Sequence, residues 1–296
     1  MELKGRTAIV TGAGGGLGRC HALQLAQLGA RVVVNDLNEA AAKSVVKEIV
    51  DGGGDALACA GSVTDETRVA EMVDAAMERF DRIDILVNNA GILRDKSFAK
   101  MDMADFRLVI EVHLMGAAIC SKAVWDIMRG QQYGRIVMTT SSSGLYGNFG
   151  QANYGAAKMA LVGLMQTLAI EGNKYNIRVN ALAPTAATAM TEGLLSAEAL
   201  ALLGPDKVSP GLLALVSEEA PTRAILCAGA GHFATANVTL TPGAHVGSGP
   251  AAARSVVRSW SAISARNDEI VPAYGFAQLE QELLSAGYSP PVLAEQ

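Results

Sequence analysis

The chain has 296 residues, of which 50% are hydrophobic and 18% are charged, with 31 glycines and 9 prolines. This composition excludes a disordered or fibrous protein and is typical of a globular α/β protein that buries a full core. The formal net charge of −5 argues against a nucleic-acid-binding protein, because phosphate binders usually carry a basic face.

Short β-branched runs alternate with longer segments of helical period along most of the chain. The expected strands are 7–10, 31–34, 83–87, 135–138 and 177–182. The expected helices are 17–29, 38–51, 65–80, 103–129 and 153–173. Strands without polar alternation are typical of a parallel sheet that is buried on both faces. The pattern predicts an α/β fold with a single doubly wound parallel sheet of Rossmann type and helices on both faces.

The alternation of strands and helices fades after about residue 204. The segment GSGPAAAR at 247–254 has the composition of a linker, and one helix is expected from Ala273 to Leu284. We therefore expect one domain over 1–246 and a C-terminal extension over 247–296. This extension is expected to pack on the domain or on a partner subunit.

The first expected strand ends in TGAGGGLGR, residues 11–19, which places Gly12, Gly16 and Gly18 between a strand and a helix. A pyrophosphate needs a tight turn, a close approach of the backbone and free N–H groups at the positive end of a helix dipole. A glycine-rich turn alone is a weak signal, since flexible loops share this composition. Its position after a strand favours a dinucleotide site.

Asp36 closes the second expected strand, eighteen residues after Gly18. Its carboxylate can accept hydrogen bonds from the ribose hydroxyls of an adenosine, and it would repel a 2′-phosphate. No Lys or Arg stands at 35, 37 or 38, so the sequence predicts NAD as the cofactor in preference to NADP. The alternative interpretation is that Asp36 caps the next helix together with Asn38.

The segment GNFGQANYGAAK, residues 147–158, places Tyr154 and Lys158 one helical turn apart. Reduction of a ketone or oxidation of an alcohol moves a proton on oxygen while a hydride moves on carbon. A phenol with a pKa near 10 is a poor base, but an ammonium about 5–6 Å away favours the phenolate. The pair therefore predicts a proton-transfer site at Tyr154 that Lys158 tunes towards neutral pH. A surface pair without function is the alternative.

TGAGGGLG at 11–18, NNAG at 88–91, Ser141, Tyr154 and Lys158 together resemble the short-chain dehydrogenase/reductase family. The resemblance covers roughly residues 3 to 240. It implies a Ser–Tyr–Lys constellation that carries hydride transfer between a nicotinamide and a carbonyl. The thirteen-residue interval to Tyr154 selects Ser141 over its neighbours, and its hydroxyl can donate to the substrate oxygen. The family's substrate lid would fall at about 190–210.

The resemblance also implies which residues contact the dinucleotide. The expected set is Gly12, Gly16, Leu17, Gly18, Asp36, Leu37, Ser62, Val63, Asn89, Ala90, Gly91, Tyr154, Lys158, Pro184 and Thr188.

Two positions depart from the family pattern. Most members carry an asparagine that bends a helix and holds a water beside the lysine, and this chain reads VHLMG with His113 in that place. Histidine can also donate, accept and anchor a water, so we include His113 among the catalytic residues, with a packing role as the alternative. After the sixth strand the chain reads APTAATAMT, one residue shorter than usual, and Thr188 is assigned to the nicotinamide carboxamide.

The segments NNAGILRDKSFAKM, VHLMG and SSSGLYGNFGQANYGAAK resemble the (3R)-hydroxyacyl-CoA dehydrogenase units of peroxisomal multifunctional β-oxidation enzymes. The resemblance implies a 3-hydroxyacyl thioester as substrate and NAD⁺ as acceptor. A hydroxysteroid (17β-type) or other secondary-alcohol dehydrogenase and a 3-oxoacyl-carrier-protein reductase remain alternatives with the same chemistry. A non-catalytic NAD-sensing protein is disfavoured because Ser141, Tyr154 and Lys158 are all retained. Arg94, Lys96 and Lys100 either meet coenzyme A phosphates or are solvated.

Four scattered cysteines form no CxxC pair and no metal-ligand spacing, which predicts reduced thiols and no metal site. No apolar run is expected to reach the length of a membrane span, and the start MELKGRTAIVTG is expected to leave no room for a signal peptide. The end AEQ lacks a peroxisomal SKL signal, so a cytoplasmic protein is expected. The helices 103–129 and 153–173 are apolar all round and predict a homodimer or homotetramer.

Overall fold

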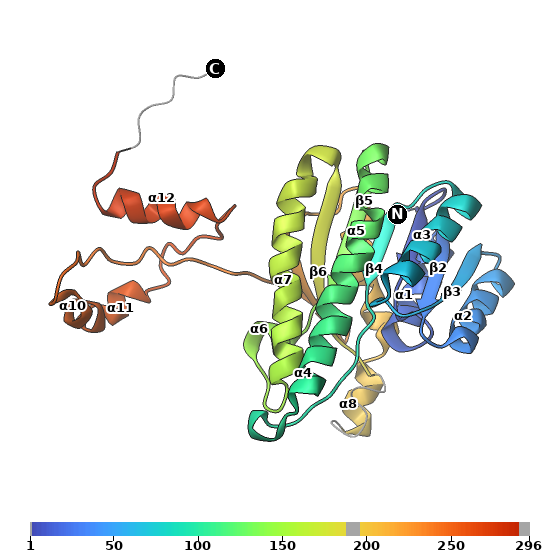
Figure 1. The fold of residues 1–296 in the computed structure, drawn as a ribbon, viewed down its shortest axis with the longest axis horizontal. Helices are drawn as coiled ribbons and strands as arrows, with labels where there is room; N and C mark the ends of the chain where they lie inside the picture. The colour runs from blue at the N-terminus through green and yellow to red at the C-terminus, as the bar shows by residue number, and fades with distance from the viewer. Residues whose placement is uncertain (1, 188–195, 290–296) are drawn as a thin grey trace, which may run out of the picture. The chain divides into compact units, whose positions relative to one another are not determined.

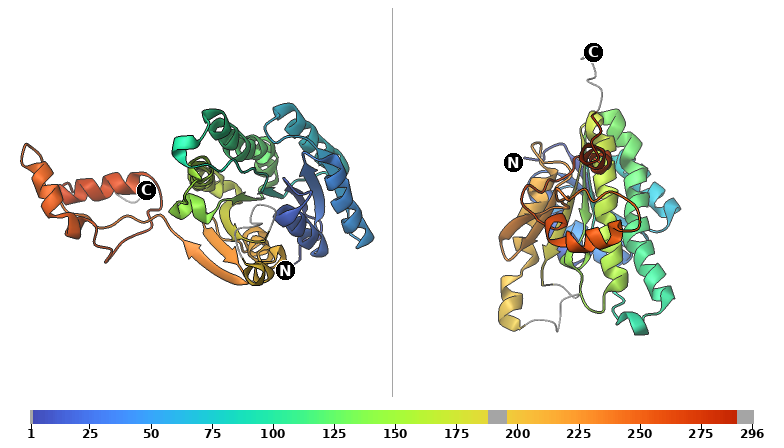
Figure 2. Two further views of the ribbon diagram at one scale, coloured as in Figure 1. Left: turned by 90° about the horizontal axis from the view of Figure 1, so that it is seen from below. Right: turned by 90° about the vertical axis from the view of Figure 1, so that its left-hand side faces the viewer.

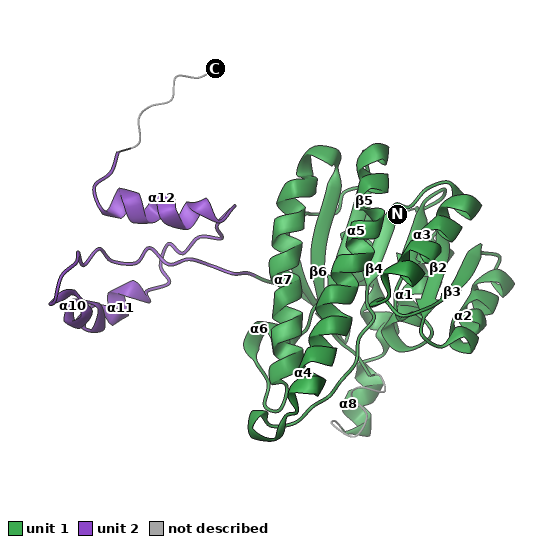
Figure 3. Ribbon diagram, viewed as in Figure 1, with its two compact units in different colours: residues 1–236 green, residues 237–296 purple. Residues whose placement is uncertain are grey.

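The computed structural model describes residues 2–187 and 196–289 and divides into two compact units (Figure 3). Unit 1 is Met1–Ala236 and unit 2 is Asn237–Gln296. Every described residue of unit 2 is exposed or half-buried, so the hydrophobic core of the chain lies in unit 1. The units divide ten residues before the expected boundary at 246/247, because the last strand of the sheet ends at Ala236.

Unit 1 is built on an eight-stranded sheet of order β3-β2-β1-β4-β5-β6-β7-β8 (Figures 1 and 2). Neighbours among the first seven strands pair in parallel, and β8 pairs antiparallel with β7. The strands are β1 Thr7–Val10, β2 Arg31–Asp36, β3 Ala56–Ala60, β4 Ile85–Asn88, β5 Gly134–Thr139, β6 Ile177–Thr185, β7 Ile225–Gly229 and β8 His232–Ala236. The chain reverses its direction of winding between β1 and β4, which is where doubly wound sheets bind their ligands.

Helices cover both faces of the sheet. In unit 1 they are α1 Gly16–Gln27, α2 Glu39–Asp51, α3 Glu66–Phe80, α4 Met103–Ile110, α5 Gly116–Gln131, α6 Ser142–Tyr146, α7 Ala152–Gly172, α8 Ala197–Leu202 and α9 Ser209–Val216. Alternate strand residues face opposite layers: Ile9 and Val33 pack with α3, α5 and α7, whereas Ala8 and Val32 pack with α1, α2 and α9. Both faces are apolar, which explains why the strands lack polar alternation.

Polar side chains cap the amino ends of three helices. Asn38 accepts a hydrogen bond from Ala41 N–H at 3.2 Å, Asp65 caps α3, and Asp102 caps α4. Each satisfies a backbone donor that has no partner within its helix. The N-cap of α2 is therefore Asn38, and Asp36 contributes only by accepting a hydrogen bond from the N–H of Asn38.

The expected fold is confirmed, and three strands were not expected. β3 reads ALACA and β7 reads ILCAG, and their Ala and Gly residues have low strand propensity. β8 is an exposed edge strand, so it carries no run of buried β-branched residues. These strands are formed by pairing with a neighbouring strand rather than by their own propensity.

The expected helix 103–129 consists of α4 and α5 joined by a π-helical turn, Glu111–Met115. Among the described residues, the joined run Met103–Gln131 is long and apolar enough, by length and composition, to cross a membrane. This corrects the expectation that no run reaches that length. In this structure Ala117, Cys120 and Val124, which belong to α5, are buried in the hydrophobic core. The core helix of a globular protein can be as long and as apolar as a membrane span.

The described part of unit 2, residues 237–289, contains the helices α10 Ala252–Arg258, α11 Trp260–Ile263 and α12 Phe276–Ser285. A backbone bridge between Leu240 and Ile270 joins its extended segments. The helix expected from Ala273 to Leu284 corresponds to α12, shifted by a few residues. That unit 2 packs on the domain or on a partner subunit stays a prediction.

Candidate active site

Most of the predicted site residues stand at the carboxyl ends of parallel strands. Because parallel strands all end at one edge of the sheet, residues that lie far apart in the sequence meet there. The contributing positions are Gly12 to Gly18 after β1, Asp36 at the end of β2, Ser62 after β3, Asn89 after β4, Ser141 after β5 and Pro184 in β6.

The glycine-rich turn after β1 is closely packed against the end of β4. Gly12 has a φ of +61°, and a Cβ there would lie 2.8 Å from Ala90 Cα. A Cβ on Gly18 would lie 2.3 Å from the carbonyl oxygen of Gly12. No side chain caps the start of α1, so its first-turn N–H groups are left for an anion. These features fit the pyrophosphate of a dinucleotide.

The packing of this turn leads to a prediction about Gly18. We expect the Gly18→Ala variant to lose about 1–3 kcal/mol of unfolding free energy, because the added methyl group meets backbone atoms that cannot move aside. Gly163→Ala is the matched control, since nothing lies within 4 Å of its added Cβ in the middle of α7. Urea denaturation measures both variants. Equal stability of the Gly18→Ala variant and the unmodified protein would contradict this packing.

Asp36 is held at the mouth of the glycine-rich turn. Its Oδ2 accepts a hydrogen bond from Gly14 N–H and its Oδ1 accepts one from Asn38 N–H, both at 2.9 Å. Leu37 is 78% exposed beside it. Arg19, which follows the glycine-rich turn, pairs with Glu48, with Nε at 3.0 Å from Oε1. The carboxylate is therefore positioned to meet a ribose, with the guanidinium of Arg19 already engaged.

The NNAG segment fastens the glycine-rich turn to β4. Asn89 Nδ2 donates to the carbonyl oxygens of Thr11 at 2.9 Å and Gly12 at 3.1 Å. The Thr11 hydroxyl accepts from the N–H groups of Asn89 and Ala90, each at 3.0 Å. Sequence reasoning missed Thr11. The signal for it was a hydroxyl residue placed between the end of β1 and the first glycine.

Two other predicted contacts lie in the loop after β3. Ser62 Oγ lies 2.8 Å from the Thr64 hydroxyl, so it shapes the loop. Val63 is buried, and a Cβ on Gly116 would lie 2.5 Å from its Cγ2. Pro184 lies near the end of β6, whereas Thr188 and residues 190–195 of the expected lid lie outside the described residues.

The four predicted catalytic side chains come together at the start of α7. Tyr154 and Lys158 lie one turn apart on α7, between α6 and α4 (Figure 1). Lys158 Nζ lies 5.4 Å from the Tyr154 ring centroid and donates to the carbonyl oxygen of Thr139 at 2.6 Å. Ser141, at the start of α6, forms a side-chain hydrogen bond with Tyr154. The His113 ring meets the Tyr154 ring edge to face, with centroids 5.3 Å apart.

Burial dominates the protonation of the Tyr–Lys pair. Lys158 is 3% exposed, and burial lowers the pKa of its ammonium to about 7. Burial also raises the pKa of Tyr154, which the hydrogen bond to Ser141 partly offsets. In the protein by itself, burial therefore outweighs the other influences on the pKa of Tyr154, and the lowering of that pKa by Lys158 stays a prediction.

His113 lies in the π-helical turn between α4 and α5, so the residue in the family's asparagine position also sits where the helix is distorted. Its Nε2 lies 2.8 Å from the Ile92 carbonyl oxygen. Burial, and next the charge of Lys158, lower the pKa of the imidazole to about 3, so the ring is neutral. A Cβ on Gly91 would lie 2.2 Å from His113 Cε1, which is why a glycine stands at position 91.

Of the cations that follow NNAG, Arg94 lies near a carboxylate and Lys96 is held through its backbone. Arg94 Nε lies 3.6 Å from an oxygen of Asp105, and the Lys96 backbone N–H donates to the Gly150 carbonyl oxygen. Nothing here assigns Arg94, Lys96 or Lys100 to a ligand. Within residues 2–187 and 196–289, no three His, Cys, Asp or Glu side chains gather where they could hold a metal ion.

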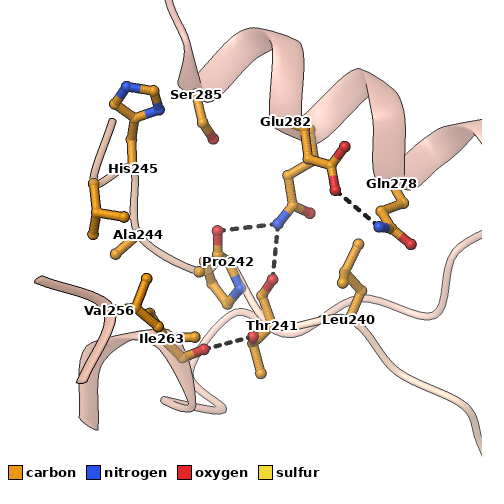
Figure 4. A pocket seen from close by; sticks show the side chains of 13 residues that line it. Leu240, Thr241, Pro242, Ala244, His245, Val256, Ile263, Gln278, Glu282 and Ser285 are labelled. Atoms are coloured by element: carbon orange, nitrogen blue, oxygen red, sulfur yellow. Dashed lines mark hydrogen bonds between the residues drawn. The ribbon is translucent and has the colours of Figure 1, made fainter. Parts of the chain in front are cut away.

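A cavity of about 360 Å³ lies within unit 2 (Figure 4). It is lined by residues between Leu240 and Ser285 and holds none of the predicted site residues. Gln281 Nε2 donates to the carbonyl oxygens of Thr241 at 2.8 Å and Pro242 at 3.0 Å along one wall. The candidate active site is therefore identified by the reactive side chains at the edge of the sheet, and not by the size of a cavity.

The chain is similar to known proteins over most of its length. Residues 6–199 match the family model described as short chain dehydrogenase. Over 227 residues the chain is 50% identical to the peroxisomal hydratase-dehydrogenase-epimerase of Saccharomyces cerevisiae, covering 74% of this chain and 25% of that protein. The chain spans about a quarter to a half of the length of the curated relatives that it matches first.

Two solved structures are similar over most of the chain. The full-length peroxisomal multifunctional enzyme type 2 of Drosophila melanogaster has a TM-score of 0.83 and 37% identity, covering 97% of this chain and 50% of that one. A 7α-hydroxysteroid dehydrogenase, solved with NADH and 7-oxo glycochenodeoxycholic acid, has a TM-score of 0.72 and 34% identity, covering 78% and 95%. The second structure holds a nicotinamide dinucleotide.

Proposed function

Because this chain belongs to the short-chain dehydrogenase family and is an oxidoreductase, we propose that it oxidises (3R)-3-hydroxyacyl thioesters to 3-oxoacyl thioesters with NAD⁺. The observation that carries the chemistry is the meeting of Ser141, Tyr154 and Lys158 beside the glycine-rich turn. The observation that favours the thioester is the 50% identity to a peroxisomal hydratase-dehydrogenase-epimerase.

When bound, the nicotinamide dinucleotide supplies the acceptor for the hydride that leaves the substrate carbon. The Ser141 hydroxyl donates a hydrogen bond that orients the substrate oxygen, and the Tyr154 phenolate removes the proton of the alcohol. Burial lowers the pKa of Lys158 to about 7, so its amino group can exchange protons at neutral pH, and its protonated form would favour the phenolate. In the reverse direction, the Tyr154 phenol returns a proton to the carbonyl oxygen.

The pKa directions give the two reactions opposite pH dependence. Burial raises the pKa of Tyr154, so its phenolate, which alcohol oxidation requires, becomes more populated as the pH rises. Ketone reduction requires the phenol and is favoured at the lower end of the pH range. The positive charge of an oxidised nicotinamide would favour the phenolate further.

Asp36 supports NAD as the cofactor, and its replacement tests this. We expect the Asp36→Ser variant to lose about tenfold in kcat/KM with NAD⁺, because two charge-assisted ribose contacts are weakened. Its kcat/KM with NADP⁺ rises, because the repulsion of the 2′-phosphate is removed. Glu39→Gln, which removes a neighbouring exposed charge at the start of α2, is the control and leaves the ratio unchanged. An unchanged ratio in Asp36→Ser would remove the argument for NAD.

The substrate is tested by comparing kcat/KM for a panel with NAD⁺. The panel contains (3R)-hydroxyacyl-CoAs of several lengths, a 17β-hydroxysteroid, a 7α-hydroxysteroid and simple secondary alcohols. We expect the thioesters to be preferred. A hydroxysteroid dehydrogenase is the second candidate, favoured by the 34% identity to a structure solved with a bile-acid ketone. Thioester rates no better than those of free alcohols would reject the first candidate.

We also propose a homo-oligomer formed through the helices 103–129 and 153–173. Large apolar side chains on these helices are partly exposed, and they include Leu108, Met115, Met159 and Ile170, between 40% and 50% exposed. Such residues are typical of helices that bury a second face against a partner. A monomeric mass by light scattering at micromolar concentration would reject this proposal.

A further inference from the structure

A small internal cavity lies beside His113, at the centre of the candidate active site. Its volume is about 10 Å³, close to what one buried water molecule needs. Its wall contains three polar side chains, Thr11, Asn88 and His113, among apolar ones such as Val63 and Leu161. A buried water needs polar partners. Whether the cavity holds a water therefore depends on which polar atoms of these three side chains are still without a hydrogen bond.

Two of the three polar side chains carry an atom without a partner. Asn88 Oδ1 and His113 Nδ1 are buried and form no hydrogen bond within the part of the chain that the structure describes. Asn88 is 5% exposed and His113 is 3% exposed. The Thr11 hydroxyl is already used, because it donates to Val87 O and accepts two backbone N–H groups.

The other polar atoms of Asn88 and His113 are engaged away from the cavity. Asn88 Nδ2 donates to Ser121 Oγ at 3.0 Å and lies 3.4 Å from Met138 Sδ, which fixes the orientation of the amide and leaves Oδ1 for the cavity. His113 Nε2 lies 2.8 Å from the Ile92 carbonyl oxygen and 3.0 Å from the Ile92 N–H. Nδ1 and Oδ1 are therefore the polar atoms left to face the cavity.

The need for a partner at His113 Nδ1 holds in both neutral tautomers. With the proton on Nε2, the ring donates to Ile92 O and Nδ1 is an acceptor. With the proton on Nδ1, the ring accepts from Ile92 N–H and Nδ1 is a donor. A water can donate to Asn88 Oδ1 while it either donates to or accepts from Nδ1. A buried polar atom without a hydrogen bond raises the free energy of the folded protein. A single water that bonds both Asn88 Oδ1 and His113 Nδ1 is therefore favoured.

We propose that one buried water molecule fills this cavity, bridges Asn88 Oδ1 and His113 Nδ1, and holds the imidazole edge-on to Tyr154. The other edges of the ring are already restrained by Ile92 and by the close approach of Gly91. The Nδ1 edge is the one that the water completes. Asn88 is then a positioning residue, acting through the water and His113 on the tyrosine 5.3 Å away.

A crystal structure of the unmodified protein at about 1.5 Å resolution tests the water directly. We expect one density peak about 2.6–3.2 Å from both Asn88 Oδ1 and His113 Nδ1. A cavity without density at that resolution would overturn the proposal. This measurement needs no variant and no activity, so it stands apart from the proposed function.

Two variants test the positioning role. Asn88→Leu removes the acceptor of the water, and Ser121→Ala removes only the other hydrogen bond of the Asn88 amide. We expect Asn88→Leu to lose the density peak, to shift the His113 Nδ1 signal in ¹⁵N NMR and to lower kcat about fivefold at unchanged KM. Ser121→Ala keeps Asn88 Oδ1 and the contact of Asn88 Nδ2 with Met138 Sδ, which still orients the amide, so it should keep all three properties of the unmodified protein. Rates are expressed per dinucleotide-binding site, so a loss of folded protein does not count as a lower kcat.

The outcomes separate this proposal from the proposed function, on which its catalytic part rests. A peak that persists in Asn88→Leu, or a kcat that is unchanged when the peak is lost, rejects the positioning role. A peak in the unmodified protein together with full activity of a Tyr154→Phe variant leaves the water site standing and rejects the proposed chemistry instead.

Discussion

The Tyr154→Phe variant is expected to lose about 10²–10⁴-fold in kcat while it still binds the dinucleotide, because only the group that moves the proton is removed. The phenylalanine ring keeps the contact with His113, so the pocket keeps its shape. NADH formation measured at saturating substrate gives kcat, and quenching of protein fluorescence on titration with NADH gives the affinity.

Tyr175→Phe is the matched control for this experiment. Tyr175 lies on the short turn before β6, at the amino end of that strand, and its hydroxyl accepts from Arg129 at 3.1 Å. The Tyr175→Phe variant should retain full activity. If Tyr154→Phe formed NADH at the rate of the control, the proton would be moved by another group, and the chemistry proposed here would be lost.

The Lys158→Met variant is expected to lose at least about 10²-fold in kcat and yet to gain stability at neutral pH. Burial lowers the pKa of Lys158 from 10.5 to about 7, so the folded protein disfavours the ammonium that the unfolded chain carries. Methionine fills a similar volume without a charge. The loss of the bond to Thr139 O offsets part of the gain, and we expect a net increase of about 1–3 kcal/mol in unfolding free energy at pH 7.

The sign of the pH dependence identifies the cause. Between about pH 7 and pH 10.5 the unfolded chain binds a proton at Lys158 that the folded protein does not, so the stability of the unmodified protein rises with pH. The advantage of Lys158→Met should therefore shrink as the pH approaches 10.5. Urea denaturation at several pH values measures this, with Lys174→Met, an exposed lysine, as the control. An advantage that stays constant with pH would mean that burial of the charge is not the cause.

Several parts of the site follow from short patterns. The Tyr154–Lys158 spacing, the glycine-rich turn and Asp36 each depend on residues close in the chain, and the structure places them as expected at one edge of the sheet. The Ser141 assignment required a family interval, because Ser142 and Ser143 carry the same hydroxyl. The local hydrogen bond of Ser141 to Ser143 N–H shows how the strand end becomes a helix start.

Other parts depended on contacts between distant segments. Thr11 acquires its role only where β4 lies beside β1, and the pairing of Asn88 with the His113 cavity needs β4 and α5 together. The raised pKa of Tyr154 follows from the number of atoms around it, which no spacing along the chain reveals. The weak strands β3 and β7 likewise form because neighbouring strands supply their hydrogen bonds.

By itself, the order of residues determined the architecture and the reacting groups of this protein, since periodicity, turns and one-turn spacings are local properties of a chain. Only tertiary structure decided how those groups are tuned. Desolvated charges, buried polar atoms without a hydrogen bond and cavities arise where segments far apart in the sequence pack together and exclude water. Their free energies therefore depend on the assembled core and not on any single stretch of sequence.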